Sequence, residues 1–261
     1  KAYAVLGEKI IRPLVREQPV DLPIRIWVPG CSTGEEAYSI ALLCFEEMAK
    51  ARREVPFQIF ASGPDDGSIA LARDGLYPAS IETEVSAAQL DKFFTKENHG
   101  YRVTSKLRNS VLFAVHDMLI DAPFSRLDLI SCRNVLIYLR PDMQQKALAL
   151  FHFALHEGGT LFLGSSETVG KFEDRFKPVS STQRIYRRAG KSRPQDVTFP
   201  VGIAERIHTL WPRMAPRSEP RRTGHAEVAQ RLLLNTFAPA SVLISAKFEP
   251  LYYFGPIDQY L

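Results

Sequence analysis

The clearest chemical feature of this 261-residue sequence is a pair of adjacent carboxylates that follows a glycine turn. Gly30 and Gly34 mark the turn, and Glu35 and Glu36 come directly after it. A loop that binds nucleotide phosphates instead has Lys and then Ser or Thr after its last glycine. Two carboxylates at that place repel a di- or triphosphate and attract a ligand that carries a cationic amine.

S-adenosylmethionine has the matching chemistry, because it carries an ammonium group and a sulfonium centre and no phosphate. The turn follows a predicted strand at residues 24–28. In an open α/β sheet, the loop after the first strand lies at the edge of the sheet where ligands bind. A helix is predicted after the turn from apolar residues at helical spacing, namely Ala37, Ile40, Ala41, Cys44, Phe45 and Met48.

Ser32 and Thr33 precede this helix and are expected to cap it. Thr33 and Glu36 have the spacing of a capping box, in which two side chains satisfy free backbone N–H groups at a helix start. A capped helix after a buried strand is also common in proteins that bind nothing at that place. The spacing alone therefore leaves a ligand loop and a plain structural turn both open.

The remaining chain alternates predicted strands and helices, which is the pattern of an α/β fold. A helix is predicted at residues 1–17, strands at 56–61, 127–131 and 160–164, and a closing hairpin at 176–179 and 183–188. Further helices are predicted at 68–73 and at 142–156, the latter ended by Gly158 and Gly159. A small inserted β-subdomain is expected at about 77–115, with a helix at 86–94 and strands at 100–103 and 111–115.

Composition excludes several classes of protein. The net charge of +4 is too small to favour nucleic acid as a partner. No apolar run approaches the roughly 20 residues that span a bilayer, so no membrane insertion is expected. Cys31, Cys44 and Cys132 are far apart, which indicates reduced thiols in a cytoplasmic protein and no metal site. Residues 189–227 have the composition of a linker, and 228–261 predict a helical start followed by two strands.

Three runs in this order, GCSTGEEAYSIALL, DLISCRNVLIYL and GGTLFLGSSETVG, resemble the CheR-type chemotaxis methyltransferases. The resemblance covers residues 1–188 and implies a Rossmann-like class I S-adenosylmethionine-dependent methyltransferase fold. The later run NTFAPASVLISAKFEPLYYFG resembles the start of a PAS domain. The chain starts at Lys1 without Met, so we expect it to be a piece of a hybrid signalling protein. Such proteins carry PAS segments together with CheB-type methylesterase or histidine kinase segments.

The resemblance also implies roles for particular residues. Tyr138 is expected near the transferred methyl group, and Arg133 is expected to line the reaction pocket and to draw in a substrate carboxylate. Asp117 and Met118 correspond to a pair that flanks the adenine. The full expected cofactor set is Gly30, Ser32, Thr33, Gly34, Glu35, Glu36, Asp65, Asp117, Met118, Arg133 and Asn134.

The implied activity is methylation of glutamate side chains of chemoreceptor-like proteins, with S-adenosylhomocysteine as the product. A glutamate side chain has a pKa of about 4.3 and is already the nucleophile near neutral pH, so no general base is expected. One departure favours an alternative. The family has Asp at the end of the second strand, where Gly63 stands here, which removes a contact of about 1.5–3 kcal/mol with the ribose. The alternative is a sensor or scaffold domain that binds the cofactor weakly or not at all. A nicotinamide dehydrogenase is disfavoured, because the turn is not GxGxxG.

Overall fold

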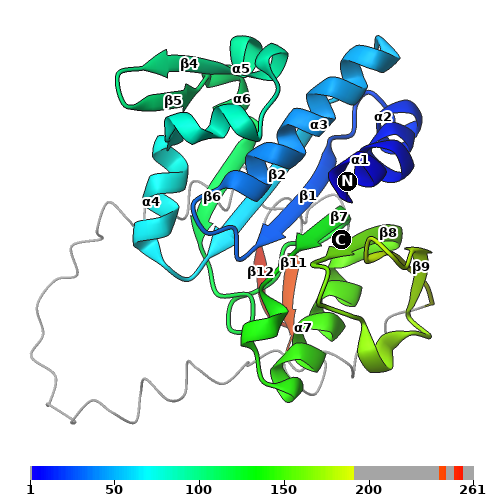
Figure 1. Ribbon diagram of the computed structural model, residues 1–261. Helices are drawn as coiled ribbons and strands as arrows, with labels where there is room; N and C mark the ends of the chain where they lie inside the picture. The colour runs from blue at the N-terminus through cyan, green and yellow to red at the C-terminus, as the bar shows by residue number, and fades with distance from the viewer. Residues whose placement is uncertain (1, 191–240, 245–249, 255–261) are drawn as a thin grey trace, which may run out of the picture. The chain divides into compact units, whose positions relative to one another are not determined.

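The computed structural model describes residues 2–190, 241–244 and 250–254 (Figure 1). The chain divides into two units, residues 1–201 and 202–261, and each is described by itself. The helical elements of the first unit are α1 (Ala2–Leu6), η1 (Gly7–Ile11), α2 (Arg12–Glu17), α3 (Glu35–Ala51), α4 (Asp66–Asp74), η2 (Ala79–Thr83), α5 (Ala87–Phe93), α6 (Ser105–Arg108), η3 (Leu136–Tyr138), α7 (Pro141–Ala154) and η4 (Gly170–Phe172). Its strands are β1 (Ile24–Pro29), β2 (Phe57–Gly63), β3 (Leu76–Tyr77), β4 (Phe94–Glu97), β5 (Gly100–Val103), β6 (Val111–Val115), β7 (Leu127–Cys132), β8 (Leu155–Leu163), β9 (Phe176–Ser180) and β10 (Ile185–Arg188).

A seven-stranded sheet in the order β6-β2-β1-β7-β8-β10-β9 forms the centre of the first unit. The first five of these strands are parallel, whereas β10 is antiparallel to both β8 and β9. The chain leaves β1 toward β2 on one side and later returns to β7 on the other side. Ligands of such sheets bind beyond the carboxyl ends of the strands at this reversal, which here lies between β1 and β7.

Both faces of the sheet are covered, and the side chains of β1 show the alternation directly. Ile26 and Val28 belong to the core under α3, whereas Trp27 belongs to a second core under α7. All three side chains are fully buried. Burial on both sides explains why the strand is continuously apolar from Ile26 to Pro29 rather than alternating.

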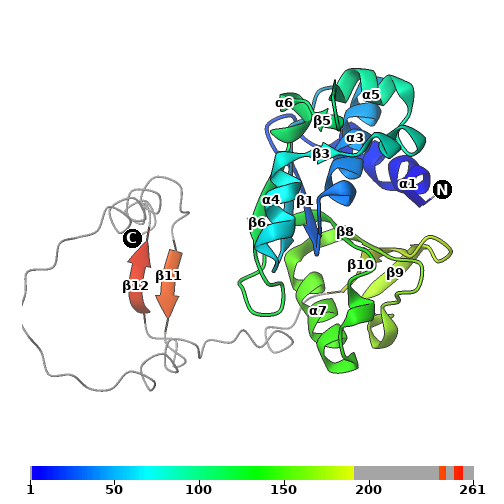
Figure 2. The same ribbon diagram turned by 60° about the vertical axis from the view of Figure 1, so that its left-hand side comes forward.

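The inserted subdomain is smaller than the sequence indicates. It has a three-stranded sheet in the order β3-β5-β4, and Figure 2 shows β3 and β5 grouped with α5 and α6, apart from α7. The predicted end of the insertion at residue 115 is wrong, because β6 pairs in parallel with β2, from Ile59 opposite Val111 to Gly63 opposite Val115. The strand signal was correct, but only the pairing partner decides to which sheet a strand belongs.

One helix differs from its prediction in hydrogen bonding, and another differs in where it ends. The N-terminal helix is confirmed as a continuous helical run, although its middle part, η1, has π-helical hydrogen bonding. Helix α7 ends at Ala154, so the prediction that Gly158 and Gly159 end it is wrong. Strand β8 begins already at Leu155, which is buried and pairs with Leu127. The helix therefore ends before the two glycines, because Leu155 is buried as part of the sheet.

The described part of the second unit is an antiparallel pair of strands, β11 (Ser241–Ile244) and β12 (Pro250–Phe254). The two strands predicted in this tail are confirmed, whereas the PAS resemblance stays a prediction. The predicted linker beyond residue 190 and the predicted helical start near residue 228 lie outside the described residues. Among the residues that the structure describes, no helix has the length and apolar character needed to cross a membrane.

Candidate functional site

The glycine turn after β1 runs directly against the turn that follows β7. Gly30 has a φ of 68°, and a Cβ atom there would lie 2.6 Å from Cγ2 of Val135. Gly34 has a φ of 95°, and a Cβ atom there would lie 3.0–3.1 Å from Ala72, Phe113 and Tyr77. Both positions therefore need glycine for conformation and for space. The result is a tight loop at the sheet edge where β1 and β7 end.

Hydrogen bonds from neighbouring elements anchor this loop. The backbone N–H of Cys31 donates to the carbonyl of Ser62 near the end of β2, at 2.9 Å. The hydroxyl group of Tyr77 donates to the carbonyl of Thr33 at 2.8 Å. These bonds hold the loop from two sides, which leaves its shape set before any ligand arrives.

The predicted capping of α3 by Ser32 and Thr33 is wrong. The N-cap residue is Gly34, and no side chain caps the helix. The hydroxyl group of Thr33 instead donates to the carboxylate of Glu35, at 2.7 and 2.8 Å. Ser32 is exposed and has a φ of 48°. The first N–H groups of α3 are thus not occupied by side chains of this loop, and they can serve an anionic group of a ligand.

Glu36 lies at the centre of the site. The hydroxyl group of Ser131, in β7, donates a hydrogen bond to Oε1 of Glu36. Burial raises the pKa of Glu36 to about 7, although the Ser131 hydrogen bond and the charge of Arg133 both act to lower it. The charge of the nearby Glu167 raises it further. A carboxyl group poised near neutral pH is stabilised in its ionised form by any cation that approaches it.

Arg133 follows β7 and lies between two aromatic rings. Its guanidinium carbon lies 5.2 Å from the ring centroid of Tyr3 and 4.9 Å from that of Phe162. Its Nη1 donates to the hydroxyl oxygen of Tyr3 at 3.3 Å. Within the described part of the chain its buried Nε has no hydrogen-bond partner. An unpaired buried donor is costly, and a carboxylate ligand would satisfy it.

Tyr3 brings the N-terminal helix into the site. Burial raises the pKa of Tyr3 to about 12, and the charge of Glu36 acts in the same direction. The hydroxyl group therefore stays protonated near neutral pH. The ring of Tyr3 also packs edge-on against Phe162, with centroids 5.9 Å apart. Sequence reasoning missed Tyr3, because nothing in the local pattern of a helix indicates which distant side chain one of its residues will meet.

Glu167 is the second residue that sequence reasoning missed. Its side chain is only 4% exposed, and its carboxylate accepts four backbone hydrogen bonds. Three come from Asn134, Val135 and Leu136 at 2.8–3.0 Å, and one comes from Gly164 at 2.6 Å. The carboxylate thus fixes the turn that carries Arg133 and joins it to the end of β8. The sequence feature that could have indicated a role for Glu167 is its position within the run GGTLFLGSSETVG.

Strand β2 ends at Gly63, so this position offers no acidic side chain to the site. A Cβ atom at Gly63 would meet only Cδ1 of Ile69, at 3.8 Å, so there is room for a side chain. Asp65 is occupied as the N-cap of α4, where its carboxylate accepts a hydrogen bond from the N–H of Ser68 at 2.7 Å. Hydrogen bonding to Ser68, first through its side chain and then through its backbone, lowers the pKa of Asp65. A role for Asp65 in cofactor binding stays a prediction.

Asp117 and Met118 follow β6 at the same edge of the sheet. Oδ1 of Asp117 accepts from the N–H of Leu119 at 2.8 Å, and the N–H of Asp117 donates to Asp121 at 2.8 Å. Met118 is 8% exposed and belongs to the core that contains Trp27. Asp117 therefore shapes a turn, and Met118 provides an apolar surface beside it.

Asn134 and Tyr138 complete the predicted set. Asn134 is exposed and has a φ of 59°, a left-handed conformation that Asn tolerates better than most residues. Tyr138 lies in η3 and is 82% exposed, so its side chain faces solvent rather than a closed pocket. The structure thus brings the glycine loop, Glu36 and Arg133 together, whereas the expected position of Tyr138 near a methyl group stays a prediction.

The residues at this edge fit S-adenosylmethionine in their chemistry. Glu36 supplies a carboxyl group that a cationic ammonium would keep ionised. The glycine loop allows close backbone approach, and Met118 offers an apolar contact for a base. Because position 63 is glycine, no acidic side chain at the end of β2 is available to bind the ribose of the cofactor.

Comparison with known proteins agrees with this assignment. Residues 1–185 match the family described as CheR methyltransferase, SAM binding domain. The chain is 38% identical over 187 residues to the putative methyltransferase Cher3 of Pseudomonas putida, covering 68% of this chain and 66% of that protein. It is 35% identical over 193 residues to chemotaxis protein methyltransferase 2 of Vibrio cholerae, covering 72% of this chain and 65% of that protein.

A third relative matches along the whole chain. It is an uncharacterized 104.1 kDa protein encoded in the hypE 3′ region of Rhodobacter capsulatus, 34% identical over 266 residues. The match covers 100% of this chain and 27% of that protein. The chain thus spans about a quarter of this relative and about two thirds of the two methyltransferases.

The strand order and the glycine loop after β1 define a class I S-adenosylmethionine-dependent methyltransferase fold. Within this class, the chain belongs to the CheR methyltransferase family, and residues 1–185 are its S-adenosylmethionine-binding domain.

Proposed function

We propose that this domain transfers a methyl group from S-adenosylmethionine to glutamate side chains of chemoreceptor-like proteins. The observation that carries the proposal is the position of Glu36 at the carboxyl edge of the sheet, where its buried carboxyl group accepts a hydrogen bond from Ser131 and the charge of Arg133 acts to lower its pKa. Bound S-adenosylmethionine supplies an electrophilic methyl group. The residues of the chain have the tasks of binding, orienting and excluding water.

Each group has a distinct task in this proposal. Glu36 holds the ammonium group of the cofactor, and the first turn of α3 with its open N–H groups receives the carboxylate end. Arg133 holds the substrate carboxylate through its unpaired Nε, while Tyr3 and Phe162 keep its guanidinium in place. The substrate carboxylate is ionised near neutral pH, so no side chain of the site needs to remove a proton.

The name of one relative supports the proposed substrate class. That relative is named a chemotaxis protein methyltransferase, which supports a chemoreceptor-like protein as the acceptor. PAS and kinase segments in the same protein, with the described pair β11 and β12 as the start of a PAS domain, remain part of this proposal.

A second function is favoured by the end of β2. Gly63 removes the acidic ribose contact, and Asp65 is engaged as a helix cap. These two observations favour a domain that binds the cofactor weakly and acts as a sensor or scaffold in a signalling protein.

Calorimetric titration with S-adenosylhomocysteine, of the native chain beside Gly63→Asp, separates the two functions. Micromolar binding by the native chain supports the enzyme. Binding only by Gly63→Asp supports the scaffold. Transfer of radioactive methyl groups to an acidic receptor segment is the second measurement, and release of methanol in base identifies the product as a carboxyl ester. An Arg133→Lys variant that binds S-adenosylhomocysteine normally and transfers at the native rate would contradict the role of Arg133.

A further inference from the structure

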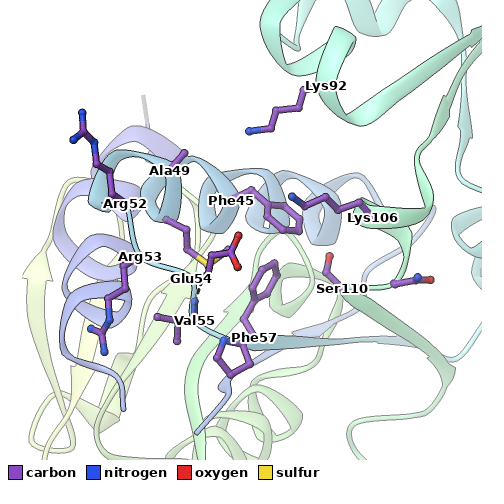
Figure 3. A pocket seen from close by; sticks show the side chains of 13 residues that line it. Phe45, Ala49, Arg52, Arg53, Glu54, Val55, Phe57, Lys92, Lys106 and Ser110 are labelled. Atoms are coloured by element: carbon purple, nitrogen blue, oxygen red, sulfur yellow. Dashed lines mark hydrogen bonds between the residues drawn. The ribbon is translucent and has the colours of Figure 1, made fainter. Parts of the chain in front are cut away.

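A hollow of about 780 Å³ lies at the edge of the sheet opposite the methyltransferase site. It is bordered by the second half of α3, the connection from α3 to the start of β2 at Phe57, and Lys92 and Lys106 from α5 and α6 (Figure 3). Its volume is within the range of about 300–1,000 Å³ that is usual for small-molecule sites. None of the residues that line it belongs to the proposed methyltransferase site.

The floor of the hollow is aromatic. Phe45 and Phe57 meet edge to face with ring centroids 5.1 Å apart. Phe93 stacks on Phe45, with ring centroids 5.2 Å apart. Phe45 and Phe57 are only half-buried although they belong to the edge of a well-packed core. A flat ring of a ligand would stack on one of these two rings and meet the other edge to face, since their planes are inclined by 74°.

Two lysines form one wall of the hollow. Lys92 and Lys106 are exposed, and Figure 3 shows both side chains reaching over the space above the phenylalanines. Nζ of Lys106 lies 5.2 Å from the ring centroid of Phe45. Among the residues that the structure describes, no carboxylate forms an ion pair with either lysine. By contrast, Arg53 is engaged with backbone carbonyls of Val15 and Gln18, at 3.0 and 2.6 Å.

Glu54 supplies the carboxylate of the hollow, whose lining also includes the polar side chains of Asn109 and Ser110. Glu54 follows α3, is exposed, and Figure 3 shows its carboxylate turned toward Phe45. A carboxylate beside an aromatic floor accepts hydrogen bonds from N–H groups at the edge of a ring. Guanine has two such donors side by side, whereas uracil has one. The wall of lysines is suited to phosphate.

We propose that this hollow binds a guanine nucleotide, with its phosphates on Lys92 and Lys106, its base on the Phe45–Phe57 floor, and its N–H edge on Glu54. An acidic peptide would also satisfy the lysines, but it would not use the ring floor. The site is separate from the cofactor site, since α3 carries Glu36 in its first turn and the hollow begins at Phe45, about 13 Å further along the helix.

Calorimetric titration of the full chain with GDP tests the proposal, with inorganic phosphate and ribose 5-phosphate as probes that lack the base. We expect saturable GDP binding and at least tenfold weaker binding of both other probes. Lys106→Ala and Lys92→Ala should each weaken GDP binding by about tenfold or more. Lys177→Ala, an exposed lysine in β9, is the matched control and should leave the affinity for GDP unchanged.

Two further variants test the base. Phe57→Leu should reduce the affinity for GDP to that for ribose 5-phosphate, and Glu54→Gln should remove the preference for GDP over UDP. The proposal is wrong if GDP does not bind, if GDP binding is unchanged in both pocket lysine variants, or if hexaglutamate binds in place of GDP. Thermal unfolding of each variant shows whether it is folded.

Discussion

The hydroxyl group of Ser131 at the end of β7 donates a hydrogen bond to the carboxyl group of Glu36 in the first turn of α3. These residues are 95 positions apart in the sequence. Their contact joins the glycine loop to the strand that carries Arg133. It also places a carboxyl group with a pKa of about 7 where the proposal requires a partner for the cofactor ammonium.

The first prediction concerns the pH dependence of cofactor binding. Glu36 must be ionised to attract an ammonium group, so the affinity for S-adenosylhomocysteine should rise as pH increases to about 7 and should then level off. Below that pKa the affinity should fall by up to about tenfold per pH unit. Calorimetric titrations between pH 5.5 and 8.5 measure this profile.

Glu36→Gln serves as the test variant for the same profile. It should bind more weakly at pH 8 and show no rise in affinity near pH 7. Glu8→Gln, an exposed position on the N-terminal helix, is the control and should keep the native profile. An unchanged rise in Glu36→Gln would assign the titration to another group.

The second prediction concerns the ribose contact. Gly63→Asp should tighten binding of S-adenosylhomocysteine by about 10- to 100-fold, because it restores a charge-assisted hydrogen bond. The added Cβ atom meets only Ile69, at 3.8 Å, so the variant should fold. Gly63→Asn has nearly the same size without the charge and should give a smaller gain. Equal affinities of Gly63→Asp and the native chain would show that the end of β2 does not face the ribose.

The third prediction concerns the buried carboxylate of Glu167. Glu167→Gln should lower the free energy of unfolding by about 2–4 kcal/mol, because an amide cannot accept all four backbone hydrogen bonds and places an NH₂ group against N–H donors. Urea denaturation measures the loss. Glu173→Gln, at an exposed position nearby, is the control and should change the free energy of unfolding by less than about 0.5 kcal/mol. A loss of the same size in both variants would mean that the four hydrogen bonds contribute nothing specific.

The fourth prediction concerns His156 and Asp128. Nε2 of His156 lies 3.0 Å from Oδ1 of Asp128, whose Oδ2 accepts from the N–H of Arg25 at 2.7 Å. The Asp128 hydrogen bond raises the pKa of His156 in the folded protein. A raised folded pKa stabilises the protein fully below the unfolded pKa of about 6.5, and this stabilisation disappears as pH rises through the folded pKa.

The difference in free energy of unfolding between the native chain and His156→Gln should therefore shrink as pH rises from 5.5 to 9. It should stay below about 1 kcal/mol, because His156 is 43% exposed. Urea denaturation at several pH values measures it. A difference that is constant over this range would show that the ion pair does not contribute, and His99→Gln controls for loss of an imidazole elsewhere.

Several elements of the site followed from local patterns. The strand, glycine turn and helix around Gly30 and Glu36 were predicted correctly, because turn chemistry and helical spacing are properties of neighbouring residues. The strand before Arg133 was also predicted correctly, from a short and mostly apolar run between polar segments. The capping of α3 was not, because Thr33 has a carboxylate partner two residues away that competes with the backbone.

The sequence by itself determined the fold class, the glycine loop and its acidic helix start, since each depends on residues within one contiguous segment. Only the tertiary structure decided that β6 belongs to the main sheet, that Tyr3 and Phe162 hold Arg133, and that Glu167 fixes the turn at Asn134 from 33 positions away. These contacts depend on which segments become neighbours in the folded chain. Local propensity carries no record of such neighbours, because strand pairing and side-chain partners are chosen by burial and hydrogen bonding of the whole core.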